Sequence, residues 1–293
     1  MSETQNFKRA ASAGASVSET ELEFLDIDNP EGGAPWRIAR RFRPSSGEGA
    51  RAPGLVWLGG FASDMNSTKA GFLDAWAAER GRSFLRFDYS GHGESQGRFE
   101  DGCIGDWLEQ SAALFERSTR GPQIVVGSSM GGWIALLLAR RLAEKGAQDR
   151  LAGLVLLAPA VDFTEELIWK NVDESIRREI METGAWRRIS QYAADPTPIT
   201  RKLIEDGRRR LLLGAIIRAH APVHILQGMA DPDVPWRHAL TLVEHLSADP
   251  VTSSFIADGD HRLSRPQDLA QLAAAIELMS AQPKGAPQGD LFG

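Results

Sequence analysis

The chain has 293 residues, with 33 Lys and Arg against 39 Asp and Glu, giving a formal net charge of −6. Hydrophobic residues make up 42% and charged residues 25%, a globular composition that excludes a collagen-like or generally disordered protein. The single cysteine, Cys103, excludes an intramolecular disulfide and a cysteine-based zinc cluster, and the acidic balance gives no indication of a nucleic-acid-binding face.

Residues 1–20 are small and polar, and we predict that they form a disordered tail. They hold no apolar segment of the kind found in secretory signals. The apolar stretch Leu151–Val161 is much shorter than the ~20 residues that span a bilayer. These features favour a cytoplasmic protein without a transmembrane segment.

Residues 21–280 alternate short apolar runs with amphipathic stretches of helix length, which predicts one α/β domain. Two strands at 21–28 and 36–42, joined by the turn sequence NPEGGAP, should form an antiparallel hairpin. Strands are then expected at 54–60, 84–90, 123–129, 151–159, 223–229 and 251–259, and helices at 67–80, 106–118, 130–144, 238–246 and 266–280. Such alternation predicts a mainly parallel sheet with helices on both faces and an antiparallel edge.

One segment, residues 162–219, interrupts this alternation. It shows no strand pattern and contains helical stretches at 164–184 and 201–218 around the proline-containing sequence ADPTPIT. We predict a helical cap inserted into the α/β domain. A separately folding domain is the alternative, although ~55 residues make a marginal core.

The sequence GSSMG, Gly127–Gly131, lies between a predicted strand and a predicted helix, where it matches the nucleophile-elbow pattern G-x-S-x-G. This pattern places Ser129 on a sharp turn, with its hydroxyl clear of the sheet. The N–H of Met130, at the positive end of the following helix, would bind a developing oxyanion. The alternative interpretation is a glycine-rich helix start without a catalytic role.

A serine hydroxyl needs an oriented base, and after a nucleophile elbow the acid and then the histidine follow in chain order. His261 lies in the loop after the last predicted strand, from which it can reach the serine. Asp231 and Asp233 follow the preceding strand, and either carboxylate could orient the imidazole. We favour Asp231, and Asp233 remains the alternative.

The loop within WLGGFASDMN, Trp57–Asn66, should supply the second oxyanion donor. Gly59 and Gly60 allow close approach of the backbone. We predict the Phe61 N–H as the donor, with Ala62 one position away as the alternative.

Two further residues lie in RFDYSGHGES, Arg86–Ser95. We interpret Asp88 and His92 as structural, with the aspartate accepting hydrogen bonds from turn amides. The glycines here follow G-x-G-x-x-x-G and are not followed by a helical pattern, which argues against a dinucleotide site.

Aromatic side chains in and near the insertion are candidates for a substrate pocket. Trp169 and Trp186 could equally contact the substrate or pack the cap onto the sheet, and Trp133 is a further candidate contact for which core packing is the favoured interpretation. The same two interpretations apply to the apolar residues Leu167, Ile168, Ile189 and Tyr192.

These motifs together resemble the α/β-hydrolase superfamily. Longer strings, GLVWLGGFASDMNSTKA, QIVVGSSMGGW, QGMADPDVPW and GDHRLS, are similar to its palmitoyl-protein thioesterases that also hydrolyse acyl glucuronides. The resemblance covers roughly residues 53–279. It implies an α/β-hydrolase fold, thioesterase and ester-hydrolase activity without cofactor or metal, and Ser129, Asp231 and His261 as nucleophile, acid and base. This group is known from mitochondria, which implies that location if the source is eukaryotic.

We therefore predict a serine hydrolase that cleaves small-molecule or protein-linked acyl esters or thioesters through an acyl-enzyme. The alternatives are a carbon–carbon bond hydrolase with the same triad and a non-catalytic binding protein of this fold. Residues 281–293 are predicted to be a disordered tail. Within it, Gln288–Phe292 (QGDLF) resembles the short motif by which bacterial proteins bind the DNA sliding clamp, which would add one protein partner.

Overall fold

The computed structural model describes residues 20–189 and 196–281. Three predictions fall outside these ranges: the two disordered tails (except Thr20 and Ala281), the Gln288–Phe292 motif and the role of Tyr192. Its centre is an eight-stranded sheet in the order β1-β2-β4-β3-β5-β6-β9-β10. The pairs β1–β2 and β2–β4 are antiparallel and the others are parallel, which confirms the predicted sheet and its antiparallel edge. The strands are β1 (Leu22–Ile27), β2 (Trp36–Arg43), β3 (Gly54–Leu58), β4 (Phe84–Phe87), β5 (Gln123–Ser128), β6 (Leu151–Leu157), β9 (Val223–Gly228) and β10 (Val251–Ile256).

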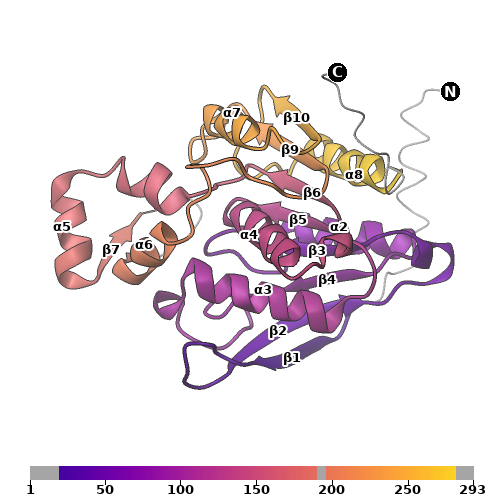
Figure 1. Cartoon of the computed structure of the whole chain (residues 1–293), viewed down its shortest axis with the longest axis horizontal. Coiled ribbons are helices and arrows are strands. Elements are labelled where there is room, and N and C mark those ends of the chain that lie inside the picture. The colour runs from indigo at the N-terminus through magenta and orange to yellow at the C-terminus, as the bar shows by residue number, and fades with distance from the viewer. Residues whose placement is uncertain (1–19, 190–195, 282–293) are drawn as a thin grey trace.

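Helices cover both faces of the sheet, as predicted (Figure 1). One face packs against α2 (Thr68–Glu79) and α8 (Pro266–Ala281), and the other against α3 (Ile104–Ser118), α4 (Met130–Glu144) and α7 (Trp236–His245). Neighbouring strand residues alternate between these two layers: Val125 packs in the α4 layer and Val126 in the α2 layer. Both faces of the central strands are therefore buried, which explains why they are apolar throughout.

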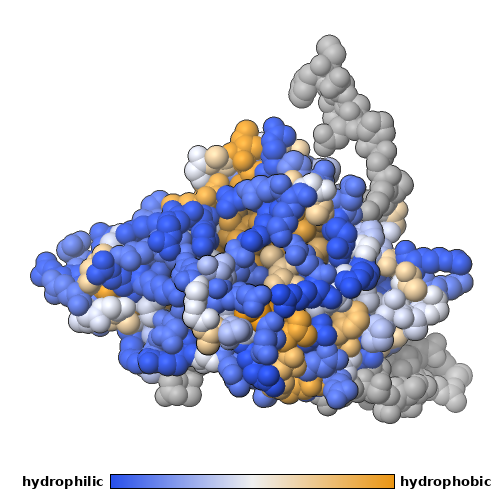
Figure 2. Space-filling view, turned by 60° about the horizontal axis from the view of Figure 1, so that its bottom comes forward, coloured by the Kyte–Doolittle hydropathy of each residue, from blue (hydrophilic) through white to orange (hydrophobic). Residues whose placement is uncertain are grey.

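The exterior is mainly polar. Figure 2 shows a largely hydrophilic face on which hydrophobic side chains gather in a few areas. Among the described residues, no helix has the length and apolar character needed to cross a membrane.

Residues 162–219, here called the cap insertion, connect β6 to β9, and the part of it that the structure describes, 162–189 and 196–219, adds no strand to the main sheet. The cap elements α5, β7 and α6 lie together beside the sheet, at the left of Figure 1. Its elements are a π-helical turn (Thr164–Trp169), α5 (Glu174–Thr183), β7 (Ala185–Arg188), β8 (Thr197–Thr200) and α6 (Arg201–Arg208).

The predicted helical cap also contains two strands that the sequence did not indicate, because β7 and β8 form an antiparallel hairpin. Each strand has four residues, which is too short for a period-two pattern to stand out in the sequence. Across the hairpin Trp186 is opposite Ile199, and this cross-strand pair supplies its apolar contact.

The predicted helix 201–218 ends early, at Arg208, because backbone N–H groups after it donate to a side chain outside the helix. The buried carboxylate of Asp162, at the start of the cap insertion, accepts hydrogen bonds from the N–H groups of Leu212 and Leu213 at 2.8–3.0 Å. Asp162 thus ties the first residues of the insertion to its last segment.

This aspartate should make stability depend on pH. Burial raises the pKa of Asp162 from 3.8 to about 6, so the native state favours its protonated form. Its stabilising contribution is therefore complete below about pH 4 and is lost as pH rises to about 6. We expect the free energy of unfolding of Asp162→Asn, measured with urea, to rise relative to that of the wild type by up to about 3 kcal/mol between pH 4 and pH 7. A difference between the two proteins that does not change with pH would contradict this prediction.

Candidate active site

The turn between β5 and α4 holds Ser129 in a backbone conformation that is unusual for serine, with φ 54° and ψ −118°. Close backbone contacts on both sides enforce this turn. A Cβ on Gly127 would lie 2.4 Å from the Gly131 carbonyl oxygen, and one on Gly131 would lie 2.1 Å from that of Leu58. Glycine is therefore required at both positions, and the strained turn lifts the Ser129 side chain clear of the sheet.

Ser129, His261 and Asp231 form a continuous chain of hydrogen bonds. The Ser129 Oγ lies 3.1 Å from Nε2 of His261, and the opposite ring nitrogen, Nδ1, lies 2.8 Å from Oδ2 of Asp231. Because the carboxylate only accepts, Nδ1 carries the proton and Nε2 is left to accept from the serine hydroxyl. This tautomer suits His261 to remove the proton from Ser129.

The loop after β9 distinguishes the two candidate acids. The Asp231 side chain is fully buried, and its Oδ1 accepts the backbone N–H groups of Asp233 and Val234 at 2.8 and 2.9 Å. These bonds aim its Oδ2 at His261. The Asp233 carboxylate instead forms an ion pair with Arg188 of the cap hairpin, at 3.2 Å. The structure therefore brings Asp231, rather than Asp233, into the hydrogen-bonded chain.

Asp231, Asp233 and His261 also meet the geometric minimum for a metal site, since one ligand-type atom from each lies within 4.8 Å of the others. Asp231, however, already accepts two backbone N–H groups through Oδ1 and the histidine N–H through Oδ2. A metal ion would have to replace the bond between Asp231 and His261. The donor set fits a hydrogen-bonded triad better than a cation site.

The two predicted oxyanion donors lie on either side of Ser129. Met130 is the first residue of α4, so its N–H has no acceptor within the helix. On the other side, a Cβ on Gly60 would lie 3.4 Å from the Ser129 Cβ, which shows how closely the loop before Phe61 approaches. The Ala62 N–H donates to Nε2 of His92 at 3.3 Å, and this bond favours Phe61 over Ala62 as the second donor.

The loop that carries His261 is held from α2. Lys69, which is more than nine-tenths buried, donates a hydrogen bond from Nζ to the carbonyl oxygen of Arg262. Burial lowers the pKa of Lys69 to about 8, and the nearby Asp260 carboxylate opposes this shift. Lys69 thus fixes the backbone directly after His261.

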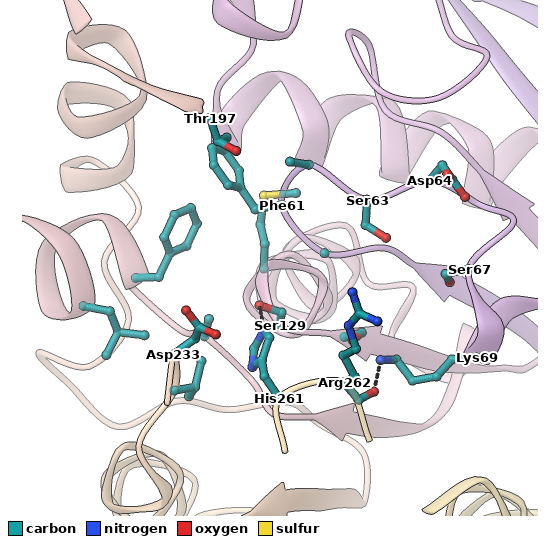
Figure 3. A pocket seen from close by; sticks show the side chains of 18 of the residues that line it. Phe61, Ser63, Asp64, Ser67, Lys69, Ser129, Thr197, Asp233, His261 and Arg262 are labelled. Atoms are coloured by element: carbon teal, nitrogen blue, oxygen red, sulfur yellow. Dashed lines mark hydrogen bonds between the residues drawn. The ribbon is translucent and has the colours of Figure 1, made fainter. Parts of the chain in front are cut away.

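A cavity of about 600 Å³ opens above Ser129 and His261, and its two sides differ in character (Figure 3). Toward the cap insertion the wall includes the apolar side chains of Phe61, Met130, Phe163, Leu167, Ile168, Ile199 and Val234, together with the polar Arg188, Thr197 and Asp233. On the other side it is polar and includes Ser63, Asp64, Asn66, Ser67, Lys69 and Arg262. The cavity can therefore accept a molecule with an apolar part and a polar part joined near Ser129.

The three candidate tryptophans, Trp133, Trp169 and Trp186, are not among the residues that line this cavity. Trp133 is fully buried in the core, and its indole N–H donates to the Arg210 carbonyl oxygen. Trp169 packs under the guanidinium groups of Arg177 and Arg208, and Trp186 packs against the core from β7. Large aromatic rings here fill space between the cap and the sheet.

Other cap residues have mixed outcomes. Leu167 and Ile168 line the cavity. Ile189 is 85% exposed, so it neither lines the cavity nor packs in the core. Sequence reasoning interpreted Arg188 mainly as part of a solvated face and missed Thr197 and Ile199, yet all three line the cavity from the cap hairpin. The missed hairpin explains this omission, because its pairing directs these residues inward.

Comparisons with known proteins agree with this architecture. Residues 54–202 match the family model described as serine aminopeptidase, S33. The chain is similar to the Bos taurus protein named palmitoyl-protein thioesterase ABHD10, mitochondrial, with 30% identity over 78% of this chain and 72% of the relative. A solved structure from Agrobacterium vitis S4 has a TM-score of 0.85 and 44% identity, covering 90% of this chain and 100% of that one. Mouse α/β hydrolase domain-containing protein 10 has a TM-score of 0.76 and 28% identity, covering 88% and 98%.

Proposed function

This chain belongs to the α/β-hydrolase superfamily, and from that premise we propose that it is a serine hydrolase of acyl thioesters or carboxylic esters. The observation that carries the proposal is the hydrogen-bonded chain Asp231–His261–Ser129 at the floor of a cavity. The strained turn at Ser129 adds support, because it exposes the hydroxyl to that cavity.

In the proposed mechanism, Ser129 Oγ attacks the acyl carbonyl carbon while Nε2 of His261 accepts the hydroxyl proton. Asp231 stabilises the imidazolium, and the N–H groups of Met130 and Phe61 stabilise the oxyanion. The intermediate collapses to acyl-Ser129, and the departing thiolate or alkoxide takes the proton from His261. Water then gives a proton to His261 and attacks the acyl carbon, which releases the carboxylic acid and returns the proton to Ser129.

The acyl group should lie on the apolar side of the cavity, between Phe61, Phe163 and Ile168. The similarity to a protein named as a palmitoyl-protein thioesterase supports an acyl substrate of this kind. The name of that relative includes the word mitochondrial, which supports a mitochondrial location for this protein if its source is eukaryotic. For any other source we propose a cytoplasmic location.

A fluorophosphonate probe tests the proposed nucleophile directly. Trypsin cleaves after Arg120 and Arg140, so one peptide contains both Ser128 and Ser129. We expect the phosphonate mass on this peptide, and fragmentation should place it on Ser129. Labelling of Ser128, or of a different peptide, would contradict the assignment.

A substrate panel tests the reaction class. Wild-type protein should hydrolyse nitrophenyl esters and acyl-coenzyme A thioesters faster than an aminoacyl nitroanilide, because the apolar side of the cavity accommodates an acyl group. Turnover of a dienoate ketone without any ester turnover would favour the carbon–carbon hydrolase instead. Failure to turn over any of these compounds would favour a binding protein.

A further inference from the structure

The loop after β3 bends sharply at Ala62, directly after the proposed donor Phe61. Ala62 has a φ of 55°, in the left-handed region that alanine seldom adopts. One local bond supports the bend, from the Ser63 N–H to the Gly60 carbonyl oxygen at 3.2 Å. The Ala62 N–H points out of the loop and donates to Nε2 of His92, at 3.3 Å. His92 therefore supports the bend from a different part of the chain.

The surroundings of His92 make its ring a fixed acceptor. Its Nδ1 lies 3.2 Å from the carbonyl oxygen of Ser90, which can only accept, so Nδ1 carries the proton and Nε2 does not. The same carbonyl accepts the indole N–H of Trp107 at 3.3 Å, which holds it in place. Burial lowers the pKa of His92 to about 4, so the ring stays neutral at neutral pH.

Aromatic packing then fixes the position of the ring. His92 is 4% exposed and contacts Tyr89, Phe99 and Trp107, with ring centroids 4.9–5.5 Å apart. Phe61 packs against Phe99 and Trp107 as well, at 4.9 and 6.1 Å. The same aromatic cluster therefore holds both the acceptor and the side chain of the proposed oxyanion donor.

We propose that His92 is a positioning residue for oxyanion binding: by accepting the Ala62 N–H it fixes the loop so that the Phe61 N–H is presented to the reacting carbonyl. This inference rests on the proposed function and deepens it. His92 touches neither Ser129 nor His261 in the described hydrogen-bond network, so it acts through the backbone of residues 61–62. It also explains why Ala62 is unsuited to be the donor, since its N–H is already used.

The test compares His92→Phe, which keeps an aromatic ring without the acceptor, with His92→Gln, whose Oε1 can replace Nε2. For nitrophenyl ester hydrolysis, His92→Phe should lower kcat about 10- to 100-fold and change KM less than about threefold. Affinity for an aryl trifluoromethyl ketone, which forms a tetrahedral adduct, should fall by a similar factor. His92→Gln should recover kcat to within about fivefold of the wild type.

Phe115→Leu is the packing control, because this fully buried ring of α3 belongs to the same core layer and packs under Arg150 rather than against Phe61 or His92. It should lower Tm without a selective loss of affinity for the ketone. A folded His92→Phe protein with kcat and ketone affinity within twofold of the wild type would overturn the proposal, and so would equal losses in His92→Phe and His92→Gln.

If His92→Phe does not fold, His92→Asn replaces it, because the shorter amide cannot reach the Ala62 N–H. Equal activity of His92→Asn and His92→Gln would then overturn the proposal, and activity in His92→Gln alone would support it. Failure of the proposed function gives a different result, because the wild-type protein itself would then show neither turnover nor labelling.

Discussion

Replacement of Ser129 by alanine should lower kcat for a nitrophenyl ester by about 10⁶-fold. The change removes the atom that forms the acyl-enzyme, and His261 then has no hydroxyl to deprotonate at 3.1 Å. Binding should change little, because the cavity keeps its apolar and polar sides. Steady-state kinetics, together with Tm as a measure of folding, will check this result.

Ser111→Ala provides a matched control. Ser111 is a buried serine that lies in α3 and donates to the carbonyl oxygen of Trp107 rather than to His261. It should retain kcat within about twofold, with a small loss of stability from the hydrogen bonds to Trp107 and Tyr89. If Ser129→Ala keeps more than a hundredth of the wild-type activity, Ser129 is not the nucleophile and the proposed mechanism fails.

Replacement of Asp231 by asparagine should lower kcat about 1,000- to 10,000-fold. The amide removes the negative charge that stabilises the His261 imidazolium. If its NH₂ group faces Nδ1, it also favours the tautomer in which Nε2 carries the proton and cannot accept from Ser129. Steady-state kinetics, with Tm as a measure of folding, will check this result.

Asp233→Asn separates the two neighbouring aspartates. The Asp233 carboxylate pairs with Arg188, and both side chains are partly exposed, so this ion pair contributes little to stability. We expect its kcat to stay within about threefold of the wild type. A greater loss in Asp233→Asn than in Asp231→Asn would reverse the assignment of the acid.

The sequence by itself determined the order of strands and helices outside the cap insertion, and it identified Ser129 and His261 as candidates. This information is local. A doubly buried strand is apolar along its whole length, and an elbow needs glycine at Gly127 and Gly131 because backbone passes where a Cβ would lie. The order of nucleophile, acid and histidine follows from the order of strands, so chain position alone identified the loop that holds His261.

Tertiary structure decided everything that depends on which distant groups meet. Asp231 and Asp233 have the same chemistry, and they differ because two backbone amides orient the first while Arg188, 45 residues away, pairs with the second. The cap hairpin likewise escaped detection, since two four-residue strands depend on each other more than on their own sequence.

The loop after β3 is a second case in which the sequence cannot say which groups meet. Phe61 and Ala62 are adjacent backbone donors, and no local pattern distinguishes them. The neutral ring of His92, buried 30 residues further along the chain, accepts from Ala62, and this bond leads us to propose Phe61 as the donor. Which polar groups pair with each other is set by packing, because burial makes each unpaired donor costly and the fold supplies the partner.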